Sequence, residues 1–361
     1  MPDNEEIIRN LTNHYHIKVI KAFGNVDSAS KSIEIIAKSL KEIYRYFEPD
    51  FFSGDFFVCK NFDDKPCFDE SRGTYIYDKN ILLNRTSGLM IIQVFDDNSK
   101  MILWENENFA ELFDQKTTLT YLFKSNKEYF YADKNEIDIT ICSKGSRFAT
   151  QFNDLVSQLQ EYSITKISKS SCNHFSDSWA DEKRLFFRGG GRGNNIPEKF
   201  MQLSLYEYLS STIGRGISME SSREYNISGE TGKPKPVDIK IHWREANRTA
   251  IIELKFLGTV LPDSGGAPYT HSDSRANEGI EQLKGYHDNV LSDTPSTIIK
   301  SHLVVIDGRR NNLVAGKTTI TAIDGMHYKD LDIVIDADKK FHETIQGFEK
   351  PIKMFAEPIC L

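Results

Sequence analysis

The sequence Val-Asp-Ile-Lys-Ile at residues 237–241 and the sequence Ile-Ile-Glu-Leu-Lys at residues 251–255 decide the fold of the second half of this chain. Both runs are rich in β-branched residues and alternate apolar with polar side chains, which is typical of strands. The polar residues 242–248 between them include an Ala-Asn pair and are short enough for a hairpin connection. The two runs are therefore predicted to be neighbouring strands of one sheet.

The predicted hairpin brings three charged side chains together. Because successive residues of a strand point to opposite faces, Glu253 and Lys255 share one face, and the apolar residues that alternate with them share the other. Asp238, on the first strand, then lies at the same edge of the sheet. Two carboxylates and an amine at one place suit a divalent-metal site that hydrolyses phosphodiester bonds, because a metal turns bound water into a nucleophile.

Composition bounds the class of protein. At 361 residues the chain is long enough for two domains of ordinary size. A hydrophobic content of 39% and a charged content of 27% exclude a disordered or fibrous chain. The net charge of -7 argues against a surface coated with basic residues. A nucleic-acid partner stays open, because bulk charge says little about one cleft.

Cysteine usage and the apolar runs predict a soluble, cytoplasmic protein. The five cysteines form no C-x-x-C pair and no metal-ligand spacing, so neither a disulfide framework nor a zinc site is expected. The N-terminal residues lack the basic-then-apolar order of a signal peptide. The longest apolar runs, such as residues 89–94, are too short to span a bilayer, so no membrane partner is expected.

The first half of the chain predicts an α+β domain at residues 1–166. Residues 4–47 carry apolar side chains at helical spacing, and residues 51–141 contain short β-rich runs separated by turn residues. These turns favour antiparallel pairing. An amphipathic helix at residues 148–162 closes this half. The role of the domain stays open among target recognition, binding of a protein partner and regulation.

The serine-rich residues 168–178 predict a linker into an α/β domain at residues 167–361. The expected elements of that domain, in chain order, are a strand-like run at 184–187, a glycine-rich run at 188–193, a helix between Pro197 and Gly214, a strand at 219–227, the two motif strands, a polar loop at 258–274, a helix at 275–290 and a buried strand at 302–306.

This order of elements resembles the PD-(D/E)XK nuclease superfamily, which includes type II restriction enzymes and RecB-type nucleases. An alternating strand often carries a solvated Glu-Lys pair, so the resemblance depends on the whole order rather than on one triplet. It covers roughly residues 185–306. The residues that carry it are Pro236 and Asp238, with one residue inserted between Pro and Asp, then Glu253-Leu254-Lys255, then Gln282 and Tyr286 as the Q-x-x-x-Y element of the RecB-like branch, and Glu198 as the upstream acid, with Glu207 as a weaker candidate.

The resemblance implies a restriction-endonuclease-like domain with a central mixed sheet flanked by helices. It implies that Asp238 and Glu253 ligate Mg²⁺, or Mn²⁺ in its place, with help from the Leu254 backbone carbonyl. Lys255 would orient the attacking water, and Glu198 would complete a second metal site or hold a metal-bound water. Gln282 and Tyr286 share a helix face and would hydrogen-bond the DNA backbone or the lysine.

The function implied is a Mg²⁺-dependent DNA endonuclease in prokaryotic defence, restriction-like or anti-phage. A catalytically silent nuclease fold that binds nucleic acid or supports an assembly is the alternative, and RNA as the substrate is a weaker one. Cutting both strands usually needs two active sites, so a homodimer is a further expectation.

Several cations could contact nucleic acid near the cleft. Arg188 and Arg192 belong to the glycine-rich run, which could equally be a hinge. Lys233 and Lys235 precede the motif, and Lys240, Arg309, Arg310 and Lys317 could add charge, although scattered surface residues are as good an interpretation. The loop at 258–274 could close over substrate or be idle, and His271 and His287 could be a base or ligands, or have no role.

Overall fold

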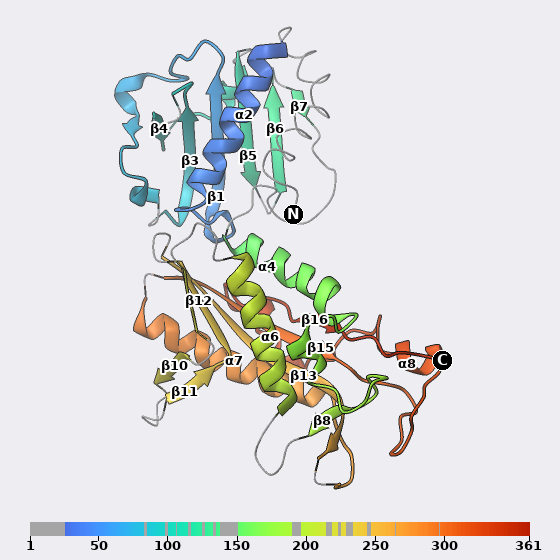
Figure 1. Cartoon of the computed structure of the whole chain (residues 1–361). Helices are drawn as coiled ribbons and strands as arrows, with labels where there is room; N and C mark the ends of the chain where they lie inside the picture. The colour runs from blue at the N-terminus through green and yellow to red at the C-terminus, as the bar shows by residue number, and fades with distance from the viewer. Residues whose placement is uncertain are drawn as a thin grey trace. The chain divides into compact units, whose positions relative to one another are not determined.

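The structure, a computed structural model, describes residues 26–82, 85–97, 100–105, 107–114, 117–124, 127–132, 135–137, 151–189, 196–213, 219–222, 225–228, 234–243, 247–263, 265–295 and 297–361. The chain divides into two compact units, Met1–Asp154 and Leu155–Leu361. The division falls inside helix α4 (Gln151–Tyr162), whereas the sequence indicated a boundary after residue 166. Figure 1 shows both units, each with its own sheet.

The first unit is a seven-stranded sheet with helix α2 (Val26–Ile43) lying across it (Figure 1). Apolar side chains of α2 such as Ile36 and Leu40 are fully buried and share a core with Phe56 and Val58 of the sheet. The helical spacing predicted for this segment is therefore confirmed over residues 26–43. The strand order is β2-β4-β3-β1-β5-β6-β7, with bounds β1 Ser53–Asn61, β2 Thr74–Tyr75, β3 Ser87–Val94, β4 Met101–Trp104, β5 Thr118–Lys124, β6 Lys127–Ala132 and β7 Asn135–Ile137.

The antiparallel pairing that the turns favoured is confirmed for the described strand pairs of this unit, with one exception. β1 and β3 run parallel, with Ser53 opposite Ser87, although the other pairs of the sheet are antiparallel. The reason is the long connection at residues 62–86, which contains β2 and two short 3-10 helices. This crossover returns the chain to the starting end of β1, so β3 runs in the same direction.

The second unit is an α/β fold with a mixed sheet flanked by helices (Figure 1). β12 and β13 form the predicted antiparallel hairpin, with Ile239 opposite Ile252 and Trp243 opposite Arg248. Helix α7 then connects β13 to the parallel strand β15, and β16 pairs parallel to β15. The strand order is β16-β15-β13-β12-β9, with bounds β9 Met219–Ser222, β12 Ile239–Trp243, β13 Arg248–Pro262, α7 Asp273–Asp293, β15 Ile298–Asp307 and β16 Ile352–Phe355.

Helix α7 fixes one wall of this unit. Its apolar residues recur every three or four positions, so they form one stripe that packs on the sheet. The stripe Ala276, Ile280, Leu283 and Val290 shares a buried core with Ile251, Leu257, Leu303 and Val305 of β13 and β15. Helix α6 (Ile196–Thr212) also contacts β13. Both helices therefore pack against the same central strand.

Strand β13 is longer than expected. The polar loop predicted at residues 258–274 begins only after Pro262, because residues of the strand's last third pair with β14 (Tyr269–His271) and with β8 (Phe187–Gly189). Gly258 has a positive φ of 145°, and a Cβ there would lie 2.8 Å from the ring of Phe187. A glycine is therefore needed where β8 approaches β13.

The serine-rich segment expected to be a linker is an integral part of the second unit. It contains helix α5 (Asn173–Ser176), and the Trp179 ring nitrogen donates to the Ser170 hydroxyl at 3.0 Å. Ser178 is fully buried. Across the described ranges, no helix is long and apolar enough to cross a membrane.

Candidate active site

The β12–β13 hairpin places the three motif side chains together. Asp238 stands immediately before β12, and its carboxylate accepts a hydrogen bond from the Leu254 backbone N–H at 2.7 Å. The ammonium of Lys255 lies 2.5 Å from a carboxylate oxygen of Glu253. The prediction that Glu253 and Lys255 share one face of the strand is confirmed.

Glu198 joins this group from the first turn of α6. One of its carboxylate oxygens lies 3.1 Å from the Lys255 ammonium, and the other lies 3.1 Å from the guanidinium of Arg275 on α7. Lys255 therefore sits between two carboxylates, and Glu198 sits between two cations. Arg275 was not predicted as a site residue. It is 77 positions from Glu198, and no local pattern marks the pair.

These side chains line a cavity of about 410 Å³. All six residues predicted to be catalytic lie on its walls, together with three further residues of α7. The lining residues are Glu198, Asp238, Glu253, Lys255, Glu281, Gln282, Gly285, Tyr286 and Asn289.

Burial raises the pKa of two carboxylates of this cavity, Asp238 and Glu253. Glu253 is 3% exposed, and its burial, together with the nearby charge of Asp238, raises its pKa to about 8. Burial also raises the pKa of Asp238 to about 6, against the opposing effects of Lys255 and of the Leu254 hydrogen bond. Ionised together, these two acids repel each other.

The lysine and the tyrosine both keep their protons. Burial alone would lower the pKa of Lys255, but the surrounding charges of Glu253, Glu198 and Asp238 outweigh it, so the pKa is raised. Burial, followed by the same three acids, raises the pKa of Tyr286. The cavity therefore holds one ammonium and one phenol that can donate hydrogen bonds to an anionic ligand.

The donor set fits a hard divalent cation. The second carboxylate oxygen of Glu253 is buried and has no hydrogen-bond partner, and a cation beside it would offset its repulsion with Asp238. Mg²⁺ typically binds through one or two carboxylates and retains waters. Asp238 and Glu253 would hold it, with the Leu254 carbonyl and Glu198 as the further predicted ligands.

The carboxylates do not form a complete metal cage as they stand. Among the described residues, no group of three or more His, Cys, Asp or Glu side chains is spaced to hold a metal ion. The physical reason lies in Lys255, whose ammonium separates Glu253 from Glu198. A metal would have to share the carboxylates with this lysine.

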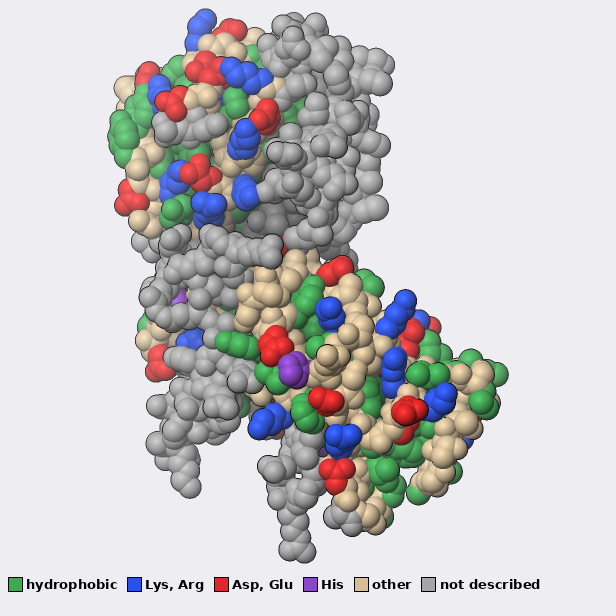
Figure 2. Space-filling model, viewed as in Figure 1, with side chains coloured by type: hydrophobic (Ala, Val, Ile, Leu, Met, Phe, Trp, Pro, Cys, Tyr) green, Lys and Arg blue, Asp and Glu red, His purple; other side chains and the backbone are tan. Residues whose placement is uncertain are grey.

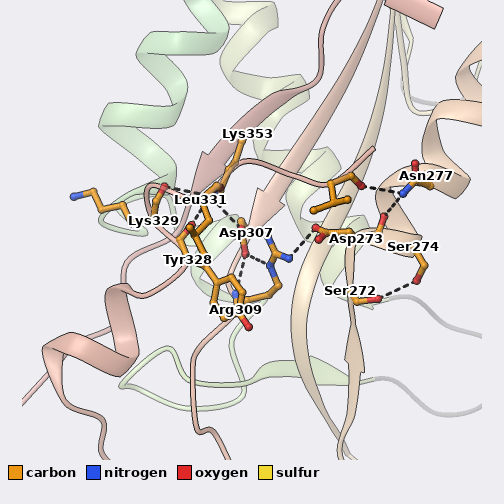
Figure 3. Close-up of polar contacts among 11 residues, drawn as sticks. Ser272, Asp273, Ser274, Asn277, Asp307, Arg309, Tyr328, Lys329, Leu331 and Lys353 are labelled. Atoms are coloured by element: carbon orange, nitrogen blue, oxygen red, sulfur yellow. Dashed lines mark hydrogen bonds and ion pairs between the residues drawn. The ribbon is translucent and has the colours of Figure 1, made fainter. Parts of the chain in front are cut away.

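Two of the cations expected near the cleft are buried elsewhere, and that expectation was wrong. Arg309 forms ion pairs of 2.8 Å with Asp307 and with Asp273, as Figure 3 shows. Arg310 donates to the backbone carbonyls of Ala356 at 2.6 Å and Arg184 at 3.1 Å. Both guanidinium groups bind partners inside the fold, because the two arginines follow directly on the buried end of β15.

Arg188, proposed to contact nucleic acid, is a half-buried residue of β8 and does not line the cavity. Lys235 lies on β11 (Pro234–Val237), and its side chain lies outside the description. Arg192 and Lys233 lie outside the described residues. On the face drawn in Figure 2, acidic and basic side chains of the described residues are interspersed rather than gathered by sign.

The remaining candidates do not line the cavity. His271 lies on β14 with its ring edge-on to Phe256, and burial, with the charge of Arg275, lowers its pKa against the charge of Glu198, so it stands close to the acidic cluster. His287 is buried, with a ring nitrogen 2.8 Å from the Ser301 hydroxyl. Glu207, the weaker choice for the upstream acid, lies 3.2 Å from His174 instead.

Comparison of the chain with protein-family models, with curated proteins and with solved structures gave no match.

Proposed function

We propose that this protein is a Mg²⁺-dependent nuclease that hydrolyses phosphodiester bonds in DNA. One observation carries the proposal: Asp238, Glu253 and Glu198 gather around the Lys255 ammonium on the wall of one cavity, with a buried oxygen of Glu253 left without a partner. A cluster of three acids and one lysine in a cavity is a chemical set for binding a cation and a phosphate together.

Each residue has a role that its surroundings support. Bound Mg²⁺ would supply charge neutralisation at the phosphate and acidify a water molecule. Asp238 and Glu253 hold the cation, and the Leu254 N–H fixes the orientation of the Asp238 carboxylate. Lys255 stays charged, so it orients the attacking water and stabilises negative charge on the phosphate. The Tyr286 hydroxyl donates a hydrogen bond from the α7 wall.

The proposal includes a restriction-endonuclease-like fold for the second unit. The β12–β13 hairpin, the crossover through α7 and the parallel strand β15 follow the order that the motif resemblance implies. A defence role against foreign DNA and action as a homodimer are extensions by analogy with that superfamily. A cytoplasmic location is part of the same proposal, since the four described cysteines are free thiols.

A catalytically silent nuclease fold is the second candidate. It is favoured by the observation that, in the described part of the chain, no three potential ligands are spaced as a metal site. Such a module would bind nucleic acid or support an assembly without cutting. RNA in place of DNA is a weaker third candidate.

Metal-dependent cleavage of plasmid DNA, single-stranded DNA and RNA by purified full-length protein decides among these candidates. We expect cleavage of DNA with Mg²⁺ or Mn²⁺ and none with EDTA. Asp238→Asn and Lys255→Met should each reduce the rate by at least 10²-fold, a typical loss for electrostatic and acid–base groups.

Lys300→Met is the matched control. Lys300 is a buried lysine of the neighbouring strand β15, paired with Glu349 at 3.2 Å and away from the cavity lining. This variant should retain cleavage if it folds. Wild-type protein that binds DNA but never cuts it would favour the silent module, and cleavage of RNA alone would replace DNA as the substrate.

A further inference from the structure

One face of helix α7 forms a wall of the cavity beside the carboxylates. Gln282, Gly285, Tyr286 and Asn289 follow one another at intervals of three, one and three residues, so they lie along one side of the helix. The wall offers two carboxamides and one phenol. Apart from Glu281, which also lines the cavity, the wall therefore presents neutral hydrogen-bonding groups, in contrast to the charged hairpin.

Gly285 is a glycine that the fold itself does not require. It stands inside a 21-residue helix, where glycine is the least favourable residue apart from proline. A Cβ at Gly285 would meet nothing within 4 Å, whereas a Cβ at Gly279 would lie 2.7 Å from Lys255 Cγ. Packing explains Gly279 and leaves Gly285 unexplained. The absent side chain at Gly285 leaves open volume on the cavity wall.

The polar groups that flank Gly285 are available to a ligand. Within the described residues, neither the amides of Gln282 and Asn289 nor the Tyr286 hydroxyl has a hydrogen-bond partner, and none of these atoms is sealed from solvent. A carboxamide carries both donors and an acceptor, which is the pattern needed to pair with the edge of a nucleobase.

The positive charge on the cavity wall is enough to pair with one phosphate. Of the described residues that line it, Lys255 is the only lysine or arginine. Glu281, the acid on the α7 wall, is mostly exposed to solvent, which screens its charge, and it is paired with Lys339 at 3.0 Å, a lysine that it shares with Asp336. The volume of about 410 Å³ is that of a small-molecule site rather than a duplex groove.

We propose that the α7 wall is a nucleoside subsite, in which Gly285 makes room for the sugar or base next to the scissile phosphate and Gln282 and Asn289 hydrogen-bond the base edge. This inference rests on the proposed nuclease activity and specifies how that site selects its substrate. A base that enters the cavity has to leave its stack, so the nucleotide beside the cut must be unpaired or extruded.

Binding of deoxynucleoside 5′-monophosphates with Mg²⁺, followed by calorimetry or ligand-observed NMR, tests the subsite separately from catalysis. Deoxyribose 5-phosphate, which has no base, is the matched probe. We expect tighter binding of at least one nucleotide than of the sugar phosphate. Gly285→Leu should weaken nucleotide binding at least tenfold, and Gln282→Ala or Asn289→Ala should weaken it several-fold.

Asp288→Leu is the control for added bulk. Asp288 is half exposed on the same helix, outside the cavity lining, where it pairs with Lys284. Thermal unfolding of each variant checks that it folds. If Gly285→Leu does not fold, Asn289→Ala still tests the wall. The same proteins are then compared in oligonucleotide cleavage.

The outcomes separate the two proposals. Equal nucleotide binding by wild type, Gly285→Leu and Asn289→Ala, or no preference of wild type for the nucleotide over deoxyribose 5-phosphate, overturns the subsite even if DNA is cleaved. Base-dependent binding that these variants weaken supports the subsite, and it does so even if wild type cleaves nothing, in which case the nuclease proposal fails alone.

Discussion

Glu253 is an acid buried beside a second acid, and this conflict has a measurable consequence. In the folded chain its pKa is about 8, against an ordinary value of 4.5. Between these two values the folded state holds a proton that the unfolded state has released. The stability that this group contributes is therefore complete below pH 4.5 and is lost as the pH rises toward 8.

We predict that Glu253→Gln stabilises the metal-free protein at neutral pH. The substitution removes the need to keep a proton that the unfolded chain releases, which costs the folded wild type on the order of 2–3 kcal/mol at pH 7. Guanidinium chloride unfolding in EDTA at pH 5 and pH 7 measures the effect. The gain should be larger at pH 7, and added Mg²⁺ should stabilise wild type but not the variant. A gain that is the same at both pH values would contradict this account of Glu253.

His302 gives the stability of the protein the opposite dependence on pH. It is fully buried on β15, and neither ring nitrogen has a hydrogen-bond partner. Burial lowers its pKa from 6.5 to about 4, with smaller effects of Glu349 and Lys300. The unfolded chain takes up a proton that the folded chain refuses, so the stability due to this residue is complete above pH 6.5 and is lost as the pH falls toward 4.

We predict that His302→Leu makes the protein less sensitive to acid. Wild type should lose about 2 kcal/mol more unfolding free energy than the variant between pH 7 and pH 4.5. Urea unfolding at the two pH values provides the comparison. His327→Leu, at an exposed histidine, is the control and should behave as wild type. Parallel pH profiles for wild type and His302→Leu would show that His302 is not the titrating group.

At the scale of elements, helix α7 contains two glycines that differ in the space around them: a side chain would clash at Gly279 and would meet no neighbour at Gly285. A Cβ at Gly279 would press on Lys255 and on a methyl of Leu303 at 2.9 Å, so the helix can approach the sheet only without a side chain there. Gly285 has no such neighbour. The same substitution should therefore have opposite effects at the two positions.

We predict that Gly279→Ala destabilises the protein by about 1–3 kcal/mol, the usual cost of overpacking. Gly285→Ala should stabilise it by up to about 1 kcal/mol, because alanine is the better helix former. Thermal unfolding followed by circular dichroism measures both. Destabilisation by both substitutions would mean that Gly285 also packs against the fold.

The elements that the sequence predicted are those with local signals. The β12–β13 hairpin was predictable from alternation over five residues and a short polar connection. Helix α2 was predictable from apolar residues at helical spacing. The last third of β13 could not be predicted. Residues 258–262 contain Gly and Pro and resemble a loop, and their strand conformation comes from pairing with β8, more than 70 positions earlier.

The site shows the same division. Alternation places Glu253 and Lys255 together, and the order of elements indicated Asp238 and Glu198. Arg275 and the buried roles of Arg309 and Arg310 depend on contacts between distant segments, which no local pattern reveals. Charged residues predicted from sequence to be surface cations can therefore be internal ion pairs.

At the scale of the whole molecule, each compact unit has its own sheet and core, and the cavity belongs to the second. The tryptophans divide in the same way: Trp104 lies in the first unit, and Trp179 and Trp243 lie in the second. Fluorescence can therefore report the unfolding of each unit separately.

We predict that Mg²⁺ stabilises only the second unit. At a concentration one hundred times the dissociation constant, the gain is about 2.7 kcal/mol, which corresponds to a rise in Tm of about 5 °C or more. Trp104→Phe reports the second unit, and Trp179→Phe with Trp243→Phe reports the first. An equal shift of both signals would show that the units unfold together, and no shift of either would argue against a metal site.

Anomalous diffraction from crystals of the protein soaked in Mn²⁺ addresses the metal directly. The account predicts a peak at the carboxylates of Asp238 and Glu253, with the Lys255 ammonium moved off Glu253, and no such peak in Asp238→Asn crystals. Saturating Mn²⁺ with no peak there, and Lys255 still paired to Glu253, would contradict it.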